Sequence, residues 1–461
     1  MLGDTIAAVS TPHGRGGVAM IRVSGPDAIA ICDRMFSAKN KKKLAEQTAR
    51  MAVFGDIYAV EDGARESIDD GIATVFRAPA SFTGEDTVEI CCHGGTLLTQ
   101  TVLTSIFSCG ARPAEAGEFT RRAFLNGKIG LSSAEALGNI LEARTRDQIT
   151  LAHVGMRGKI EDRCGEIYDR IRHVLASIYA RIDYPDEDLA DMSREEMAEA
   201  LRQCLDQTKA LSSSYRTGHA IAEGIATVIC GKPNVGKSSL YNQLVGREAA
   251  IVTDIEGTTR DVLTETATVG RVMLRLFDTA GLHETENPVE RIGIDRTRST
   301  LAEAELVLAV FDASSPLSAE DRELLDLLRE SDACVVAVLN KSDVGGADQL
   351  SAELGFAHTV SLSARTGEGI DRLAELIDQL FTDDRINLRE DAVLTNARQH
   401  AAAIQASEAL SHAMEALACG LPVELACTDA ELAMTAIGEL DGREVSEDII
   451  SEIFAHFCVG K

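Results

Sequence analysis

The chain has 461 residues, of which 45% are hydrophobic, and it carries a formal net charge of −28. This length exceeds what one hydrophobic core usually supports, so we expect roughly two to four domains. The negative charge argues against a protein that coats nucleic acid without specificity, because phosphate contacts require clustered Lys and Arg. A nucleic-acid partner would need a local basic surface, although the candidate residues also fit an ordinary solvated face. These candidates are Lys39 to Lys43 and the arginines Arg144, Arg146, Arg157, Arg163, Arg170 and Arg172.

The cysteines and the N-terminal residues indicate the compartment. Eleven cysteines occur without a CxxC pair or a His/Cys cluster at zinc-ligand spacing, which favours a reducing environment. The first residues, MLGDTIAAVSTPHGRGG, lack a basic stretch followed by an apolar one, and no long apolar run occurs elsewhere. We therefore predict a cytoplasmic protein without membrane insertion.

Residues 1–125 alternate short β-rich runs with turn signals. The runs are VAMIRVSG, MAVFGDIYAV, GIATVFRAP and DTVEICCHGG. This pattern predicts an α+β domain at the N-terminus.

Helical periodicity begins after Ser132 and covers the predicted segment 126–222. A serine followed three residues later by glutamate predicts helix starts at Ser132 and at Ser193. Gly218 is expected to end the helix that begins at Ser193. Between these two predicted starts, apolar residues recur at the spacing of a seam buried against other helices. They are Ile160, Cys164, Ile167, Ile171, Val174, Ile178 and Ile182.

Apolar strands alternate with amphipathic helices over residues 223–382, which predicts an α/β domain with a mostly parallel sheet. Helices resume over 383–461, where Thr428 is a further predicted helix start and an apolar stripe precedes the C-terminus. Because helical stripes occur on both sides of the α/β segment, we infer that it is inserted into one discontinuous helical domain. Two separate helical domains are the alternative.

The first strand of the α/β segment leads into a phosphate-binding loop. IATVIC is followed by GKPNVGKS, from Gly231 to Ser238, and by a helix, which is the context that a P-loop requires. Glycines let backbone N–H groups surround the phosphates, Lys237 reaches the β and γ oxygens, and the Ser238 hydroxyl ligates Mg²⁺.

Two later motifs complete the predicted nucleotide site. Asp278 begins DTAG at the end of a strand and places a carboxylate near Mg²⁺. Asp343 closes the sequence Asn-Lys-Ser-Asp and can accept hydrogen bonds from N1 and the 2-amino group of guanine. Adenine offers no such pair, so ATP would leave a carboxylate unsatisfied at a cost of about 1–3 kcal/mol. The sequence therefore predicts a GTP-binding and GTP-hydrolysing protein.

The segment AIVTDIEGTTRD lies where a switch should close over the γ-phosphate, and Thr259 is the predicted second Mg²⁺ ligand. Leu282 follows DTAG in place of the glutamine that orients water in Ras-like enzymes. Glu290 is the candidate for that task, with a solvated helix carboxylate as the alternative. The predicted nucleotide contacts are Asn234, Val235, Gly236, Lys237, Ser238, Ser239, Thr253, Asp254, Ile255, Glu256, Gly257, Thr258, Thr259, Asp278, Thr279, Ala280, Gly281, Asn340, Lys341, Ser342, Asp343, Ser361, Leu362, Ser363 and Ala364.

Motifs along the whole chain resemble those of a bacterial family of tRNA-modification GTPases, MnmE, also called TrmE. They are TPxGRGG, SFTGED, HGG, GEFTxRAFLNGK, GKPNVGKSSL, TDIEGTTRD, DTAGLxxxxxxVERIGI and the C-terminal FCVGK. The resemblance implies an N-terminal domain that forms a homodimer and binds a one-carbon tetrahydrofolate, in the 5-formyl or methylene form. It also implies a helical domain and an inserted G domain.

Family folate contacts correspond to Arg22, Glu89, Lys128 and Lys461, and the family places Cys458 near the modification site. Taken alone, Arg22 and Glu89 fit charges on the surface of a strand. Whether Cys458 performs covalent chemistry or only packs there stays open.

The resemblance further implies that K⁺ replaces an arginine finger, bound by Asn234, Thr253, Ile255 and Thr258. A cation there would neutralise charge that develops between the β and γ phosphates. Glu290 then becomes the residue that orients water, so that the implied catalytic residues are Glu290, Lys237 and Cys458.

The implied reaction modifies C5 of the wobble uridine in certain tRNAs by adding an aminomethyl or carboxymethylaminomethyl group. It is performed with the FAD protein MnmG (GidA) in a heterotetramer or larger assembly, and GTP hydrolysis drives conformational change. Because this chain has no GxGxxG fingerprint, FAD is assigned to the partner. The alternative is a regulatory GTPase of ribosome assembly, which shares the nucleotide motifs but requires neither folate nor the FCVGK terminus.

Overall fold

The computed structural model describes residues 3–12, 14–61, 64–183, 192–246, 265–277, 301, 303–419 and 422–460. The chain forms two compact units. The first unit combines Met1–Leu141, Gly155–Asp169 and Met434–Lys461, and the second combines Glu142–Val154 with Arg170–Ala433.

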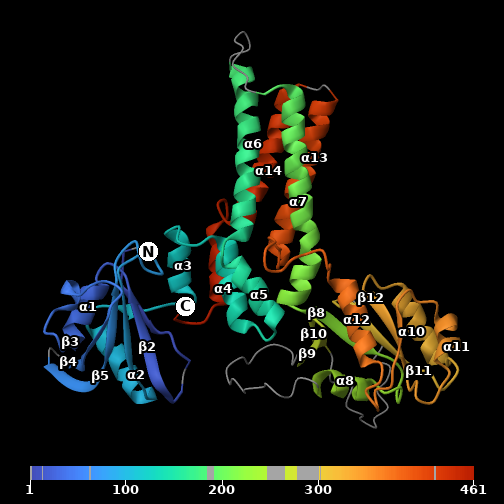
Figure 1. Cartoon of the computed structure of the whole chain (residues 1–461), viewed down its shortest axis with the longest axis horizontal. Helices are drawn as coiled ribbons and strands as arrows, with labels where there is room; N and C mark the ends of the chain where they lie inside the picture. The colour runs from blue at the N-terminus through green and yellow to red at the C-terminus, as the bar shows by residue number, and fades with distance from the viewer. Residues whose placement is uncertain are drawn as a thin grey trace. The chain divides into compact units, whose positions relative to one another are not determined.

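The first unit is built on a seven-stranded sheet in the order β3-β4-β5-β6-β2-β1-β7 (Figure 1). All neighbouring strands are antiparallel except β1 and β7. The strands are β1 (Ile6–Val9), β2 (Gly16–Ser24), β3 (Phe36–Ala38), β4 (Ala52–Glu61), β5 (Ala64–Phe76), β6 (Thr87–Gly94) and β7 (Arg112–Pro113). Helices α1 (Ala28–Met35) and α2 (Thr96–Ser108) bury their apolar residues against one face of this sheet. The four predicted β runs are thus confirmed as β2, β4, β5 and β6, and the two helices complete an α+β arrangement.

Residues from the end of the sequence complete the first unit. Helix α15 (Glu447–Ala455) packs Ile450 and Phe454 against Leu131 and Ala134 of α4 (Leu131–Glu142). Beyond α15, Val459 forms an antiparallel bridge with Ala116, just before α3 (Glu118–Leu125). The first and last parts of the sequence therefore share one core.

A buried arginine fastens α3 to the rest of this unit. The Arg122 guanidinium is 3% exposed, and it donates to the carboxylates of Asp4, Glu85 and Glu118 at 2.7–3.1 Å. An unpaired guanidinium at this depth would be strongly destabilising, so these carboxylates compensate for the burial of its charge.

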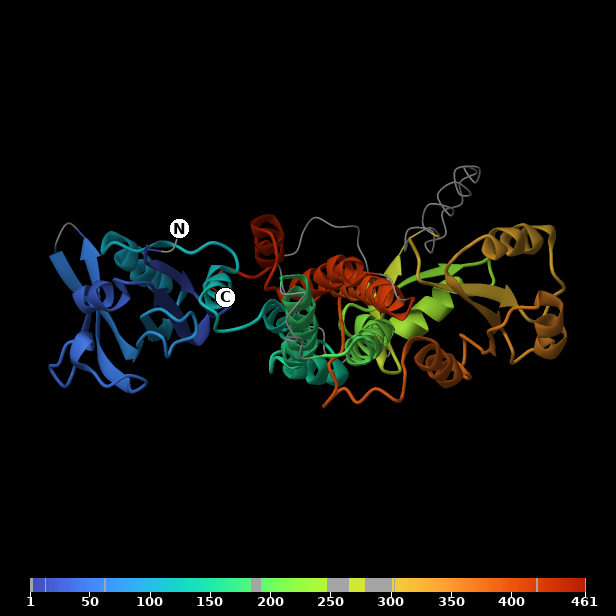
Figure 2. The ribbon, with the colours of Figure 1, turned by 90° about the horizontal axis from the view of Figure 1, so that it is seen from above.

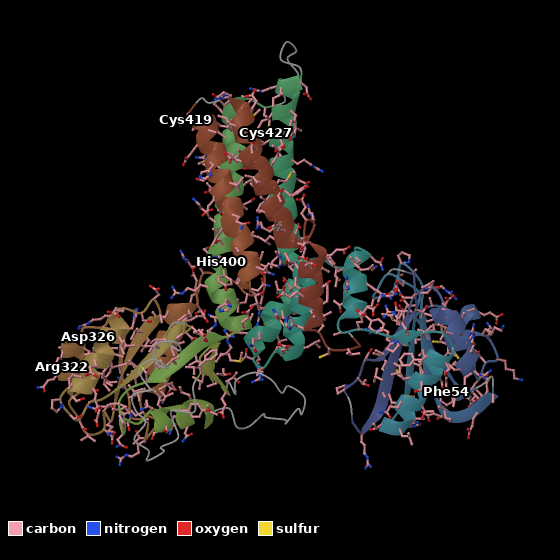
Figure 3. The ribbon with its side chains drawn as sticks, turned by 180° about the vertical axis from the view of Figure 1, so that it is seen from behind. Phe54, Arg322, Asp326, His400, Cys419 and Cys427 are labelled. Carbon is pink, nitrogen blue, oxygen red and sulfur yellow. The ribbon has the colours of Figure 1, made fainter. Side chains whose placement is uncertain are left out.

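The second unit contains long helices and a second sheet. Helices α7 (Arg194–Ala222) and α13 (Ala397–Ala418) lie side by side, as Figures 1 and 3 both show. Tyr215 of α7 stacks on His400 of α13, which Figure 3 labels, with ring centroids 4.2 Å apart. Helices α6 (Lys159–Asp183) and α14 (Val423–Asp441) contribute residues to both units, and α5 (Arg146–Gly155) belongs to the second unit apart from its last residue.

Helix boundaries agree with the sequence at one predicted start and differ at two others. The Ser193 hydroxyl accepts a hydrogen bond from the Glu196 amide at the start of α7, which confirms the predicted capping box. Ser132 lies inside α4, where its hydroxyl donates to the Leu440 carbonyl at 3.1 Å. Thr428 lies inside α14. The same sequence pattern can therefore occur within a helix when a tertiary contact takes up the hydroxyl.

Gly218 does not end α7, because the helix continues to Ala222. A Cβ atom at Gly218 would lie 2.0 Å from the Leu394 carbonyl oxygen. The glycine therefore permits the chain before α13 to pass close to the helix backbone.

The second sheet has the order β13-β12-β11-β8-β10-β9 and is parallel apart from the β9–β10 hairpin. Its strands are β8 (Ile225–Cys230), β9 (Glu265–Val269), β10 (Val272–Phe277), β11 (Leu306–Asp312), β12 (Cys334–Asn340) and β13 (Thr359–Ser361). Helices α8 (Lys237–Gly246) and α12 (Ile370–Phe381) pack on one face, and α10 (Ala319–Arg329) and α11 (Ala347–Leu354) pack on the other (Figure 2). The predicted parallel α/β domain is confirmed. No helix in the described ranges has the length and apolar content to cross a membrane.

Candidate nucleotide-binding site

The loop between β8 and α8 has a backbone that few residues can adopt. Gly231 has φ +148° and Gly236 has φ +100°, and Asn234 between them lies in the left-handed region at φ +63°. A Cβ atom at Gly236 would lie 2.2 Å from the side-chain nitrogen, Nδ2, of Asn340. Glycine thus suits this position because of its positive φ, and it leaves room for the Asn340 side chain.

Lys237 begins α8 and its ammonium group lies against the loop. The Nζ atom donates to the carbonyl oxygens of Gly231 at 2.9 Å and Lys232 at 3.0 Å. Lys232 itself points elsewhere, to the Asp321 carboxylate at 2.6 Å. The positive ammonium group therefore lies at the loop, next to the N-terminal end of α8. Both the charge and the free backbone N–H groups of a helix start favour a bound phosphate group.

Asn340 joins three segments that were predicted to contact the nucleotide. Its Nδ2 donates to the Val235 carbonyl in the phosphate loop at 2.7 Å, and its Oδ1 accepts from the Ala364 amide at 2.8 Å. The residue is only 3% exposed, so both hydrogen bonds are protected from water. Sequence reasoning treated Asn340 only as a nucleotide contact and missed this structural role.

Lys341 also forms an ion pair that could not be predicted from the motif. Its Nζ forms an ion pair with the Asp312 carboxylate, at the end of β11, at 2.6 Å. Burial would raise the pKa of Asp312, but the hydrogen bonds from Lys341 and Ser314 outweigh it and hold the pKa below its ordinary value.

The Asp343 carboxylate is held in its ionised form. The Ser363 hydroxyl and then the Arg365 guanidinium, which lies 2.7 Å away, lower the pKa of Asp343 below its usual value. An ionised carboxylate accepts hydrogen bonds but cannot donate one. It therefore suits guanine, which offers two donors at N1 and the 2-amino group, and does not suit adenine, which lacks that pair. Arg365 directly follows the predicted nucleotide contacts Ser361 to Ala364 and was not itself predicted from sequence.

The structure thus brings together three predicted segments, 234–239, 340–343 and 361–364, at the ends of β8, β12 and β13. The switch residues 253–259, the DTAG residues 278–281 and Glu290 lie outside the described residues. Of the predicted Mg²⁺ ligands the structure describes Ser238, and of the predicted K⁺ ligands Asn234. The donor set is suited to a magnesium nucleotide, with a hydroxyl, an ammonium group and backbone amides at the start of one helix.

Residues predicted to bind folate lie in the first unit. Arg22 on β2 and Glu89 on β6 are cross-strand partners, and their side chains form an ion pair at 2.8 Å. The Arg22 guanidinium also lies over the ring of Phe82, 5.1 Å from its centroid. Lys128 donates to the Pro79 carbonyl at 2.9 Å, so one loop, residues 79–86, contacts both cations.

The C-terminal motif reaches the same part of the unit. Gly460 accepts a hydrogen bond from the Ser10 hydroxyl at 3.0 Å and has φ +98°, with no room for a Cβ atom beside the Val9 carbonyl. Cys458 is exposed next to this anchor. Lys461 lies outside the described residues.

Comparison with known proteins assigns the chain to a family. A family model described as the GTP-binding protein TrmE N-terminus matches residues 5–128, and a model of the MnmE helical domain matches residues 131–458. Among solved structures, the G domain of a T. maritima FeoB iron transporter matches 34% of this chain and 97% of that chain, with 27% identity and a TM-score of 0.25.

Two curated relatives match along essentially the full length. A tRNA modification GTPase MnmE of Symbiobacterium thermophilum is 42% identical over 462 residues, covering 99% of both chains. Another of the same name, from Geobacter metallireducens, is 40% identical over 461 residues and covers 100% of both chains. This protein therefore belongs to the MnmE family of tRNA modification GTPases.

Proposed function

We propose that this protein binds GTP with Mg²⁺ at the β8–α8 loop and hydrolyses it to drive a modification of tRNA. The observation that carries the proposal is the buried Asn340 side chain, which links the phosphate loop to the loop at Ala364. Through this link, the loop that would hold the phosphates and the ionised Asp343 that would select the base have a fixed relation.

Titration calorimetry with GTP and ATP tests the nucleotide assignment. Wild type should bind GTP in preference to ATP, and Asp343→Asn should lose that preference because it replaces an acceptor-only group with an amide. Equal binding of both nucleotides by wild type would remove the basis of the proposal.

For hydrolysis, we propose that K⁺ is held by Asn234, Thr253, Ile255 and Thr258, and that Glu290 orients the attacking water. A bound cation supplies positive charge where no arginine finger is present. GTP turnover should therefore be faster in K⁺ than in Na⁺, and equal rates in the two salts would contradict the cation site.

We further propose that the first unit forms a homodimer through the exposed face of its sheet. The strand register places Phe54 beside Ile72, Ile72 beside Cys91 and Cys91 beside Met20, which forms an apolar row across β4, β5, β6 and β2. Phe54 is 50% and Ile72 is 41% exposed, and Figure 3 labels Phe54 on this sheet. A second copy that covered this row would remove substantial apolar area from water. Phe54→Glu should shift the protein from dimer to monomer in sedimentation equilibrium.

The folate proposal uses the same face. Arg22 lies two residues from Met20 on β2, and Glu89 lies two residues from Cys91 on β6. Because every second side chain of a strand points to the same face, Arg22 and Glu89 lie on the face of the apolar row and next to it. We propose that Arg22, Glu89, Lys128 and Lys461 bind a one-carbon tetrahydrofolate, with Cys458 close to the modification site.

The proposed substrate is C5 of the tRNA wobble uridine, and the proposed partner is the FAD protein MnmG. We also propose that the G domain is inserted in one helical domain. In support, the chain leaves α7 for β8 and returns after α12 to α13, which packs along α7. Mass spectrometry of tRNA nucleosides from cells without the protein should show loss of the modification at this position.

A further inference from the structure

The β9–β10 hairpin occupies a particular place in the G domain. In sequence, it lies between the proposed switch residues 253–259 and Asp278, because β9 begins at Glu265 and β10 ends at Phe277. Strand β10 also pairs in parallel with β8, which leads into the phosphate loop. A change in the nucleotide would therefore act on the hairpin from both strand ends and from its neighbour.

The turn at the opposite end of the hairpin is held by several carboxylates. Gly270 and Arg271 form this two-residue turn, and the Arg271 amide donates to Asp378 of α12 at 2.9 Å. The guanidinium contacts Asp147 of α5 at 3.1 Å and Asp384 at 3.2 Å. One arginine therefore contacts carboxylates of α5, of α12 and of the chain just after α12, and α5 precedes the G domain in sequence.

Gly270 makes this arrangement possible. It has φ +63°, and a Cβ atom there would lie 2.3 Å from the Asp378 carboxylate. The turn thus requires glycine both for its conformation and for contact with α12.

Two further contacts connect the hairpin to helices outside the G domain. Thr266 on β9 accepts from the Arg144 guanidinium, just before α5, at 2.5 Å. Arg275 on β10 lies 3.8 Å from Glu305, whose other carboxylate oxygen accepts from His219 near the end of α7 at 3.0 Å. Both strands and the turn are therefore connected to α5 or α7.

We propose that the β9–β10 hairpin transmits the nucleotide state of the G domain to α5, and that Arg271 is the positioning residue that makes this connection through Asp147. The inference rests on the proposed GTPase function. A paired hairpin moves as one unit because its ladder hydrogen bonds resist shear, so displacement at Glu265 or Phe277 reaches the turn. Arg271 contacts no part of the phosphate loop in the described residues, so its removal should leave nucleotide binding intact.

Hydrogen exchange of the full-length protein, with GDP or with a non-hydrolysable GTP analogue, tests this proposal. In wild type, the amides of α5 should exchange at different rates in the two states. Arg271→Gln and Asp147→Asn should each reduce that difference by the same amount, since the Arg144–Thr266 contact remains in both, and the double variant should behave like either single variant because both break one connection. Arg271→Lys should restore part of it. Arg385→Gln, which removes a local ion pair with Asp383, is the matched control and should behave like wild type.

A second readout is the amount of tRNA modified per GTP hydrolysed. Arg271→Gln should lower this ratio by about fivefold or more, the lower end of typical coupling between sites, while the GTP turnover rate stays at the wild-type value.

The outcomes separate the two proposals. If wild type fails to protect the phosphate loop in either nucleotide, the GTPase proposal fails, and this inference fails with it. If the loop is protected but α5 is identical in both states, the transmission proposal alone is overturned. If Arg271→Gln retains the wild-type difference, the role of Arg271 is overturned.

Discussion

Replacing Asn340 by alanine should lower the stability of the G domain far more than the same replacement of an exposed asparagine would. The substitution leaves the Val235 carbonyl and the Ala364 amide without their partner, in a place where Val235 is 1% and Ala364 is 3% exposed. Each buried group left unsatisfied costs about 1–3 kcal/mol, so the two together cost about 2–6 kcal/mol. A domain of this kind has about 5–15 kcal/mol of stability in total, so the loss would be a large part of it.

Hydrogen exchange at the Ala364 amide measures this effect locally, since several domains unfold in this chain and one global transition would not be defined. The free energy of opening at Ala364 should fall by at least about 2 kcal/mol in Asn340→Ala. Asn242→Ala, at an exposed position of α8 in the same domain, is the control and should change it by less than about 0.5 kcal/mol. If the two variants behave alike, Asn340 does not link the loops as described.

Three other changes have defined outcomes. Burial would lower the pKa of His219, but the Glu223 and Glu305 carboxylates outweigh it and raise the pKa to about 9. The charged ring then stabilises the folded protein by about 3 kcal/mol. This contribution should be complete below pH about 6.5 and lost as the pH rises through about 9. An NMR titration of the His219 ring should give a pKa of about 9 in the wild type, and a value near 6.5 would contradict the prediction. Lys237→Ala should lower GTP affinity in calorimetry about 10- to 150-fold, the worth of a charge-assisted hydrogen bond, and unchanged affinity would exclude Lys237 from the phosphate site. Glu290→Ala should lower the GTP turnover rate while leaving GTP affinity unchanged, and wild-type turnover would exclude it as the residue that orients water.

The sequence predicted the elements of the nucleotide site because each motif is local. A strand, a glycine-rich loop and a helix are adjacent in sequence, so Gly231 to Ser238 could be assigned without knowledge of the fold. The links between motifs could not be found this way. Asn340 contacts Val235 more than a hundred residues away, and only the parallel order of β8, β11 and β12 brings them together.

Helix boundaries show the same division. The capping box at Ser193 formed as predicted because no tertiary partner competes for its hydroxyl in the described contacts, whereas Ser132 donates to Leu440, three hundred residues later. Likewise, Gly218 resembles a helix end in sequence, and only the passage of Leu394 explains it. Local patterns therefore predict elements well, but they do not predict which groups long-range contacts will use.

The bridge between Val459 and Ala116 also has a consequence for synthesis of the protein. Translation proceeds at about 5–20 residues per second, so Val459 is made roughly 20–70 seconds after α3. During that interval α3 and α4 would lack their α15 partner, and apolar surface around Leu131 would remain accessible to chaperones. The N-terminal unit is thus among the first segments to leave the ribosome and among the last to acquire its complete set of contacts.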